Sequence, residues 1–590
     1  MKRFLSLIVL LLFFCLALPG TLPATAQGVA GDPYKPVLDR LESLLVQPLD
    51  GLRYHTDIAH PEAVALNDSS WSTVKVDERW SNGSRVLRRT IEIPAKLNGY
   101  STQGAKVKLE LAFDSDAPLV ISVFSNGGLV YHGGDSTQQP IPLTESAQPR
   151  QTFVIAVRLD AQNVPTRISA CRLLFEPPPD RPSPMLFRGE VLAVRPIIGA
   201  YPEGRAEREQ QVEAAVKAVD LAALDRGDQA GFDASLRQAQ TNLEKLNPWL
   251  KQFTIRAIGN SHIDMAWLWP WTETVEVVRN TFRSVLDLMR EYPEFKFSMS
   301  SARTYAWMEE KYPDLFHEIE QRVKEGRWEI VGGMWVEPDL NMPAGESLTR
   351  QILIGKRYFR DKFGVDTKIG WNPDSFGYNA QLPQIYKKSG MDYFVTQKLL
   401  WAHEFTTFPY KMFWWEAPDG SRLLTYFPHD YAGGIDAAAL GQDLSVWAPA
   451  IYGPVLKDQP ETMHLFGVGD HGGGPTRAML DNAVRVQQAN AVFPNLPFST
   501  ATEFFDDLNK RLPAMQVPVW KDELYFQYHR GVFTTQAETK RRIRRTEETL
   551  LNAEKLSSLA FLYGRPYPQY DLQRAWKGLL SVNCLFASWA

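Results

Sequence analysis

The sequence predicts a multidomain protein in which a β-sandwich-like N-terminal domain is followed by an α/β domain and then by a helical segment. The chain has 590 residues, which is too long for one ordinary domain. Between residues 85 and 176, apolar residues alternate with polar ones at the period of a β-strand. From residue 253 to about residue 518, short β-type runs alternate with amphipathic helical stretches, which is typical of a parallel α/β sheet or barrel.

The first 26 residues have the features of a secretory signal peptide. Lys2 and Arg3 give a positive start, residues 4–18 are an apolar run, and Ala24-Thr25-Ala26 is a small-x-small cleavage site. An uncleaved membrane anchor is the alternative, but the run of about 15 residues is shorter than the roughly 20 that a spanning helix needs. We therefore expect cleavage after Ala26 and a secreted or periplasmic protein with no stable membrane span.

The composition is that of a globular protein. The formal net charge is −4 with no long run of like charge, so no nucleic-acid partner is expected, because phosphate binding needs clustered Lys and Arg. One of the three cysteines, Cys15, lies in the signal segment, so we expect no disulfide framework. The 17 tryptophans suit a sugar-binding cleft, although a large core also collects tryptophan. No oligomeric state is predicted.

The region before the α/β domain divides into a β-rich part and a helical part. Residues 27–200 are predicted as a β-rich accessory domain, with strands at 107–111, 119–124 and 153–157. A carbohydrate-binding-like sandwich and a plain structural β-domain both fit this pattern, the latter slightly better. Residues 201–250 have two helical stretches with apolar faces and are predicted as a helical connector that Pro248 ends.

Residues 251–520 are predicted as the α/β domain and residues 521–590 as a helical domain. The expected strands are 253–258, 295–299, 328–331, 367–371 and 393–395, and the expected helices are 275–290, 312–325, 347–363 and 382–389. A further helix is expected over 535–562. Its predicted packing positions are Leu550, Leu551, Leu556 and Leu559.

Two polar groups follow predicted strands of the α/β domain. His262 and Asp264 are two residues apart after the first strand, so on an extended backbone they project to the same side. An imidazole beside a carboxylate suits Zn²⁺, and the carboxyl ends of parallel strands are where active sites lie. Asp374 follows another strand and is expected at the same edge. An ordinary polar strand end and a helix N-cap at Asp374 or Ser375 are the structural alternatives.

A third polar group lies in residues 465–476, where an apolar run leads into Asp470, His471 and three glycines. Glycines let a substrate approach the backbone closely. A phosphate loop fits poorly, because no lysine follows the glycines. A tight turn with incidental polar residues is the structural alternative.

These motifs resemble, in order along the chain, those of glycoside hydrolase family 38, the class II α-mannosidases. The resemblance covers roughly residues 250–580 and is closest to the bacterial, vacuolar and cytosolic branch of the family. The matching segments are 262–270, 332–339, 371–385, 469–476 and 528–536.

The resemblance implies a catalytic (β/α)7-type barrel over residues 251–520, followed by a helical bundle domain. It implies that His262, Asp264 and Asp374 bind Zn²⁺ or a similar divalent metal and that Asp374 is also the nucleophile. Asp470 is the best match to the acid/base carboxylate, with Asp339 the runner-up, and Trp267 matches the aromatic residue under the mannose ring. The implied activity is hydrolysis of terminal α-linked mannose from glycans with retention of configuration.

The sequence departs from the family near its C-terminal end. The family's fourth zinc ligand is a histidine in a Gln-x-His-Asp motif of the helical domain. Here the family-like sequence runs to Leu580, and Ser581 to Ala590 contain no histidine. A frameshift or a premature stop is the simplest account, which gives an incomplete helical domain, weak zinc binding and poor turnover as expectations for this chain.

Two other functions remain open from the sequence. A zinc-dependent polysaccharide deacetylase also places Asp and His at strand ends, but it does not require the tryptophan-rich run after Asp264 or a nucleophilic Asp374. A non-catalytic glycan-binding remnant is the alternative from another class. Mannoside binding without turnover distinguishes it from an enzyme.

Overall fold

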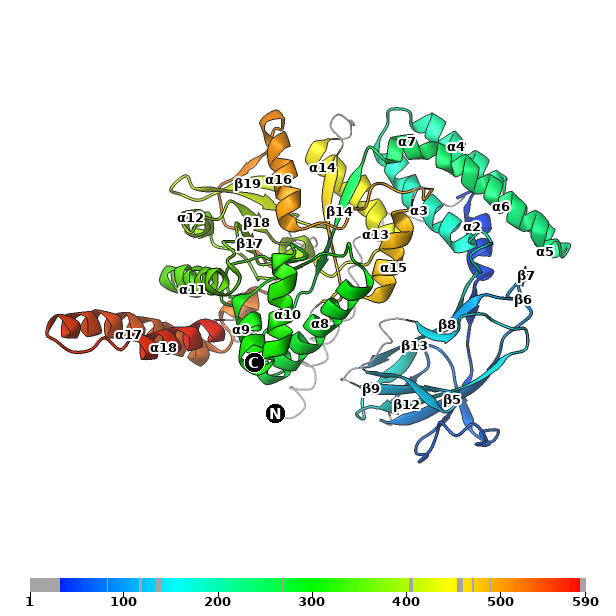
Figure 1. The fold of residues 1–590 in the computed structure, drawn as a ribbon, viewed down its shortest axis with the longest axis horizontal. Coiled ribbons are helices and arrows are strands. Elements are labelled where there is room, and N and C mark those ends of the chain that lie inside the picture. The colour runs from blue at the N-terminus through cyan, green and yellow to red at the C-terminus, as the bar shows by residue number, and fades with distance from the viewer. Residues whose placement is uncertain are drawn as a thin grey trace. The chain divides into compact units, whose positions relative to one another are not determined.

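The computed structural model describes residues 32–583, except residues 82, 116–118, 134–139, 268, 403–406, 454–459, 470, 471 and 489. The predicted signal peptide therefore lies outside the described residues. The chain divides into two compact units, which are Met1–Val191 with Glu207–Lys245 and Leu192–Ala206 with Leu246–Ala590. Figure 1 shows the elements of both.

The first unit contains two antiparallel sheets. The first sheet has the order β1-β13-β8-β11, with β4 also paired to β13, and the second has the order β10-β9-β12-β5-β2-β3. Buried and half-buried residues alternate along most of β8, so one face of this strand is more fully covered, as the period-two pattern predicts. The strands of the first sheet are β1 (Val46–Pro48), β4 (Arg79–Trp80), β8 (Lys106–Ser115), β11 (Ile141–Thr144) and β13 (Thr166–Glu176). Those of the second are β2 (Leu52–His55), β3 (Ser72–Val74), β5 (Arg85–Glu92), β9 (Val120–Ser125), β10 (Gly128–Gly133) and β12 (Thr152–Asp160). β6 (Lys96–Leu97) and β7 (Tyr100–Ser101) form a separate pair.

Helices flank these sheets in the sequence. The first is α2 (Lys35–Ser43), and the others are α3 (Pro184–Ala200), α4 (Arg205–Lys217), α5 (Leu221–Asp225), α6 (Gln229–Leu243) and α7 (Asn247–Leu250). Helix α3 differs from the sequence prediction, in which residues 27–200 form a β-rich domain. It begins at a proline and has Pro196 inside it, and internal prolines weaken a helical signal in the sequence.

The second unit contains the predicted α/β alternation, arranged as two sheets. The first has the order β16-β15-β14-β21 with all pairs parallel, and the second has the order β17-β18-β20-β19-β22. The strands of the first are β14 (Thr254–Asn260), β15 (Phe297–Met299), β16 (Trp328–Ile330) and β21 (Glu461–Phe466). Those of the second are β17 (Ile369–Trp371), β18 (Tyr393–Val395), β19 (Met412–Glu416), β20 (Arg422–Tyr426) and β22 (Val519–Trp520).

The two sheets of this unit are linked at two places by single backbone contacts. Gly332 N after β16 donates to Ile369 O of β17 at 2.9 Å. Gly433 after β20 forms an isolated parallel bridge with Phe466 of β21. Among the described residues the pairing therefore gives two sheets rather than one continuous barrel. Several strands have only three residues, so such edges hold few ladder hydrogen bonds.

In Figure 1 helices such as α8, α10, α12 and α16 lie around the strands of the second unit, whereas α17 and α18 lie side by side and project away from them. The predicted helices are found, but Ala302–Lys311 forms an additional helix before the one expected at 312–325. The helices are α8 (Trp271–Glu291), α9 (Ala302–Lys311), α10 (Pro313–Lys324), α11 (Gly345–Phe363), α12 (Leu382–Lys388), α13 (Ala437–Gln442), α14 (Ala448–Tyr452), α15 (Arg477–Val486), α16 (Ala501–Arg511), α17 (Ala537–Leu562) and α18 (Gln569–Val582).

The packing prediction for α17 is only half right. Leu550 is buried against Trp576 and Leu579 of α18, and Leu551 packs beside it. Leu556 and Leu559 are instead 65% and 54% exposed. The heptad-like spacing predicts a packed face but cannot show where along the helix a partner is present.

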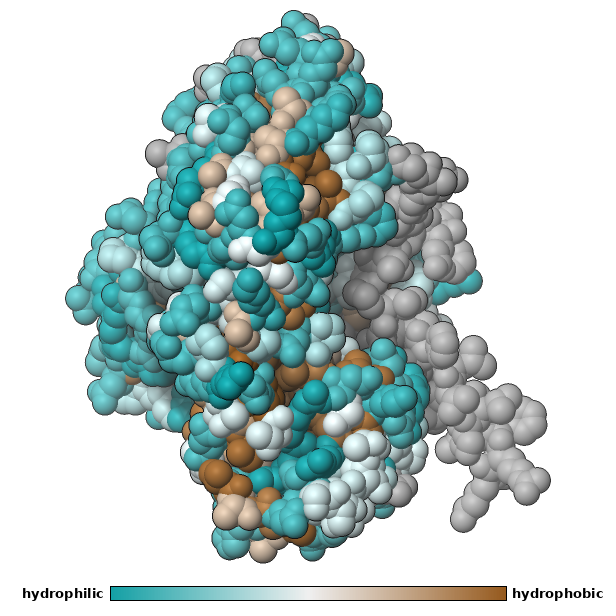
Figure 2. All heavy atoms as spheres, turned by 90° about the vertical axis from the view of Figure 1, so that its right-hand side faces the viewer, coloured by the Kyte–Doolittle hydropathy of each residue, from teal (hydrophilic) through white to brown (hydrophobic). Residues whose placement is uncertain are grey.

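The described helices and the surface differ little from those of other folded proteins. None of the described helices combines the length and the apolar character that a membrane crossing needs. Figure 2 shows one face of the molecule, where hydrophilic residues prevail and hydrophobic ones gather in small groups. Such scattered apolar surface is ordinary for a folded protein.

Helix α11 packs unusually closely on the loop that follows β16. A Cβ atom at Gly355 would collide with the backbone of Gly333 and Met334. Since backbone atoms cannot rotate away as a side chain can, only glycine allows this approach. The backbone carbonyl of the neighbouring Gln351 accepts a hydrogen bond from Trp335 N. The side-chain oxygen of Gln351 accepts a second one from Val336 N. Helix α11 therefore holds the 332–337 loop firmly in place.

A buried ion pair anchors the loop that follows β20. His464 on β21 contacts Asp443 Oδ2 through Nδ1 at 2.6 Å and the Gly434 carbonyl through Nε2 at 2.8 Å. Both partners are acceptors, so the ring donates from both nitrogens and is an imidazolium. Burial alone lowers the pKa of His464, but Asp443 and the carbonyl of Gly434 outweigh it and raise the pKa above its usual value.

We expect Gly355→Ala to destabilise the fold by about 1–3 kcal/mol, because overpacking against backbone has no cheap relief. The matched control is Gly578→Ala inside α18, where a Cβ meets nothing within 4 Å. The free energy of unfolding of the control should rise by about 0.5–1 kcal/mol, because alanine has a higher helix propensity than glycine. Urea unfolding of both variants measures the two effects. A Gly355 variant as stable as the wild type would contradict the close-packing argument.

We expect His464→Gln to cost about 3–5 kcal/mol near pH 6, since it leaves Asp443 buried without its partner. The folded-state pKa of His464 is raised, so the stabilisation is complete below about pH 6.5 and is lost as the pH rises through the folded value. The penalty should therefore shrink between pH 6 and pH 9 in urea unfolding. His317→Gln, at an exposed position on α10, is the control and should change stability by less than about 0.5 kcal/mol. A penalty that grows with pH would refute the assignment.

Candidate active site

The structure brings His262, Asp264 and Asp374 together, although two strands supply them. Strand β14 ends at Asn260 and β17 ends at Trp371, so the three side chains stand on loops at strand ends. One ligand-type atom from each residue lies within 4.8 Å of the others. His262 Nε2 lies 3.1 Å from Asp264 Oδ1 and 3.9 Å from Asp374 Oδ2. The expected convergence at one edge of the strands is therefore present.

The chemistry of this cluster fits a divalent metal ion. All three side chains are at most 5% exposed. Two carboxylates and an imidazole nitrogen are a common ligand set for such ions, and buried charges of this kind need compensation. Within the described part of the chain, this is the one group of three or more His, Cys, Asp or Glu side chains with metal-binding spacing.

Asp374 also has two donors that the sequence did not indicate. Lys398 Nζ lies 2.5 Å from Asp374 Oδ1, and the Tyr431 hydroxyl donates to the same oxygen at 3.0 Å. Lys398 begins the 3-10 helix η2 (Lys398–Ala402), which follows β18, and its backbone N donates to Pro373 O. Helix α12 begins only at Leu382, so Asp374 is not a helix N-cap.

Aromatic rings enclose the Lys398 ammonium. Its Nζ lies 3.7 Å from the ring centroid of Trp401 and 5.0 Å from that of Phe376. Trp401 is parallel to Tyr431, with the two planes 8° apart, and its side chain is partly open to solvent. The site therefore combines a buried charge pair with a partly exposed aromatic surface.

Trp267 lies at the edge of the same region. It is partly buried, packs against the core cluster that contains Phe376, and meets Trp269 edge-on with ring centroids 5.6 Å apart. This places an aromatic ring close to the loop of His262 and Asp264. Its predicted role under a sugar ring stays a prediction.

Glu337 is a third carboxylate at the cluster and was not singled out from the sequence. It lies in the loop after β16, and its Oε2 is 3.5 Å from His262 Nδ1. Its Oε1 accepts a hydrogen bond from Asp374 N at 3.0 Å. The signal that could have identified it is its place after a parallel strand, which it shares with Asp264 and Asp374.

The electrostatics of the cluster follow from burial and like charge. Burial raises the pKa of Glu337 to about 7, and the nearby Asp374 and Asp264 add to this while His262 opposes it. Burial alone lowers the pKa of His262, but Glu337, Asp264 and Asp374 outweigh it and raise the pKa to about 10. The ring thus takes up a proton readily when carboxylates surround it, so a metal ion must compete with that proton.

The structure describes only one of the two candidates for the acid/base carboxylate, which is Asp339. Asp470 and the adjacent His471 lie outside the described residues. Asp339 accepts from Asn341 N at 2.7 Å and from Met342 N at 3.0 Å, so its carboxylate closes a turn. Burial raises the pKa of Asp339.

The glycine run after His471 is held against helix α8 and β14. Ser261 Oγ donates to Gly473 O at 3.2 Å, and Gly473 N donates to Thr281 Oγ1 at 2.9 Å. A Cβ atom at Gly472 would collide with Val277 of α8. Tight packing therefore explains the glycine here without invoking close approach by a substrate.

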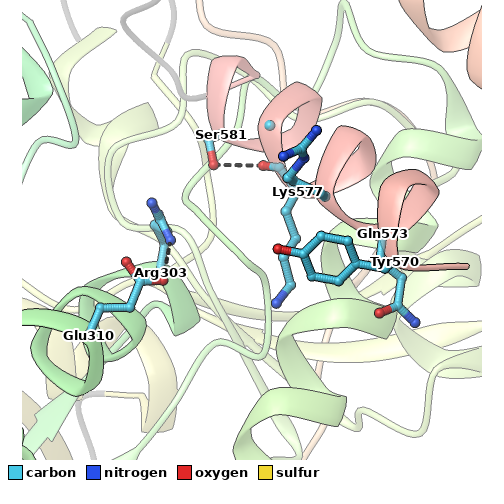
Figure 3. A pocket seen from close by; sticks show the side chains of 8 residues that line it. Arg303, Glu310, Tyr570, Gln573, Lys577 and Ser581 are labelled. Carbon is cyan, nitrogen blue, oxygen red and sulfur yellow. Dashed lines mark hydrogen bonds and ion pairs between the residues drawn. The ribbon is translucent and has the colours of Figure 1, made fainter.

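A hollow of about 410 Å³ lies between α9 and α18. Figure 3 shows Arg303 and Glu310 on one side and Tyr570, Gln573 and Lys577 on the other. The Ser581 hydroxyl, also at this hollow, donates to Lys577 O within α18 and accepts from Trp335 Nε1. Its lining has no histidine and one carboxylate, so it is not a second metal site of the kind formed by His262, Asp264 and Asp374.

Comparison with known proteins identifies the family. The model of the N-terminal domain of glycosyl hydrolases family 38 matches residues 252–523, and that of the alpha mannosidase middle domain matches residues 527–584. Together these matches cover more than half of the chain. They include all the cluster residues described above.

Individual relatives agree with this match. An alpha-mannosidase of Saccharomyces cerevisiae is 38% identical over 339 residues, and human alpha-mannosidase 2C1 is 39% identical over 334 residues. These segments are 55% and 56% of this chain and 31% of each relative, so the chain spans about a third of their length. Among solved structures, an alpha-mannosidase from Enterococcus faecalis V583 is 20% identical, with a TM-score of 0.49, covering 57% of this chain and 39% of that one. The chain belongs to glycosyl hydrolase family 38.

Proposed function

We propose that this protein hydrolyses terminal α-linked mannose in glycans, with retention of configuration and with a zinc ion at the cluster of His262, Asp264 and Asp374. The observation that carries the proposal is this buried cluster, in which Asp374 is both a candidate ligand and a carboxylate engaged by Lys398 and Tyr431. The names of the relatives, which are alpha-mannosidases, supply the substrate class.

Asp374 is well placed to act as a nucleophile. Lys398 and Tyr431 hold its Oδ1, and its backbone N is fixed by Glu337, so the carboxylate has one defined orientation. In the first step an Asp374 oxygen bonds to the anomeric carbon while the bond to the leaving oxygen breaks. In the second step water attacks that carbon, and the Asp374 carboxylate leaves.

The leaving oxygen needs a proton, for which we propose Asp470. It donates this proton in the first step and takes one from the attacking water in the second. Retention requires the two carboxyl groups to lie about 5–5.5 Å apart. When bound, zinc supplies Lewis-acid contacts to the hydroxyl oxygens of the sugar. Trp267 and Trp401 offer ring faces to the sugar.

Three further proposals concern the setting of this site. The seven strands β14, β15, β16, β17, β18, β20 and β21 form a ring, supported by the Gly332–Ile369 and Gly433–Phe466 contacts that link the two sheets. The two antiparallel sheets of the first unit pack as a sandwich. The N-terminal segment directs the protein to the periplasm or the exterior, supported by its residue pattern.

Retention of configuration is the first outcome we expect. NMR of the first-formed sugar from an α-mannoside should show α-mannose, because two displacements restore the starting geometry. Asp374→Asn should lower turnover by at least about 10³-fold, since it removes the attacking group. Asp470→Asn should slow the first step far less on a mannoside whose phenol leaving group needs no protonation, whereas the second step stays slow because the attacking water has lost its base. β-Mannose as the first product would rule out the double displacement.

Dependence of the activity on a divalent metal is the second outcome we expect. Chelation should abolish activity, and Zn²⁺ or a similar ion should restore it, because ligands at this cluster hold the ion reversibly. His262→Ala should weaken metal binding more than His471→Ala does, as measured by metal content after dialysis. Full activity in a preparation shown by elemental analysis to be metal-free would disprove the dependence. The reverse order of the two histidine variants would show that the ligands are wrongly assigned.

A further inference from the structure

Glu337 contacts two members of the metal cluster with its two different oxygens. Oε2 faces the ring of His262, which follows β14, and Oε1 accepts from the backbone of Asp374, which follows β17. The Ser375 hydroxyl lies a further 3.5 Å from Oε1. The Glu337 side chain is only 14% exposed, so both contacts are made largely away from water.

The contact with His262 fixes which ring nitrogen is available to a metal. Nε2 is the nitrogen near Asp264 and Asp374, whereas Nδ1 is turned to Glu337 at 3.5 Å. A metal binds the lone pair of a neutral imidazole, so the ring proton must then reside on the other nitrogen. A carboxylate beside Nδ1 stabilises that tautomer and the ring orientation that goes with it.

The contact with Asp374 fixes a second ligand. The hydrogen bond from Asp374 N to Oε1 is 3.0 Å long and sets where the backbone of this residue stands. The loop that carries Glu337 is itself rigid, because Trp335 N and Val336 N donate to Gln351 of α11, which is fully buried. One side chain on a firmly held loop thus joins ligands from two separate strands.

We propose that Glu337 is a positioning residue for the metal centre, which sets the tautomer of His262 and the backbone position of Asp374 so that the three ligands converge. This role rests on the metal site of the proposed function. It requires the charge and the length of glutamate, because both oxygens are used at once.

The test is the zinc affinity of the full chain, measured by competition with a chromogenic chelator rather than by activity. Glu337→Gln should weaken zinc binding about 10- to 100-fold, since carboxylates that hold the ligands of a metal contribute that much to its affinity. Glu329→Gln is the matched control, with the same chemical change on β16. Glu329 accepts from Ala501 N and Thr502 N at the start of α16. Loss of the Glu329 carboxylate should lower the unfolding temperature of the protein and leave its zinc affinity within about twofold of the wild-type value.

A second variant guards against a folding defect. Glu337→Asp keeps the charge but is one methylene shorter and cannot reach both partners, so its zinc affinity should also fall, by less than that of Glu337→Gln. Circular dichroism identifies which variant is folded. Wild-type affinity in a folded Glu337 variant would overturn the positioning role while leaving the metal site intact. A wild-type chain that binds no zinc would instead overturn the metal site, and this role with it.

Discussion

The site depends on the need to compensate several charges that the fold has removed from water. Asp264 and Asp374 are at most 4% exposed, Glu337 is close beside them, and the ammonium of Lys398 contacts Asp374. Three carboxylates against one lysine leave an excess of negative charge, which a low-dielectric interior does not tolerate. A proton on His262 compensates part of it, which is why its pKa rises to about 10. A divalent cation at the same place would supply more positive charge than that proton, so the cluster could hold a metal ion in its place.

The surrounding fold holds these groups at fixed positions. His262 and Asp264 follow β14, Glu337 follows β16, Asp374 follows β17, Lys398 follows β18 and Tyr431 follows β20, so loops at the ends of five strands supply the site. The strands themselves are short, and the loops are fixed by contacts from outside the sheets. Gly355 lets α11 touch the 332–334 backbone, and the His464–Asp443 pair anchors the loop that carries Tyr431. Site geometry therefore depends on helix packing as much as on strand pairing.

The sequence predicted the part of the site that lies in family-like motifs. A histidine two residues from an aspartate after a strand also fits an ordinary polar strand end, so His262, Asp264 and Asp374 could be assigned only because their motifs resemble those of family 38 in order along the chain. Lys398 and Tyr431 could not, because only the fold brings them to Asp374. Glu337 was missed although its place after a parallel strand was a usable signal. The strand and helix pattern of the α/β domain was predictable from periodicity. Helix α3 was not, because of its prolines, nor was the exposure of Leu556 and Leu559, because a helical pattern does not reveal how far its partner extends.

The pairing of Lys398 with Asp374 has different consequences for the two halves of the proposed reaction. An ammonium and a tyrosine hydroxyl on the same oxygen stabilise the ionised carboxylate, so they make it a weaker nucleophile when the sugar is attacked. When the bond to the anomeric carbon forms, the carboxylate loses its charge and both contacts weaken. In the second half the charge returns to Asp374, and the same two donors stabilise it as a leaving group. Since a donor contributes to rate only where it binds the transition state more tightly than the preceding state, Lys398 and Tyr431 favour release of the sugar over its capture.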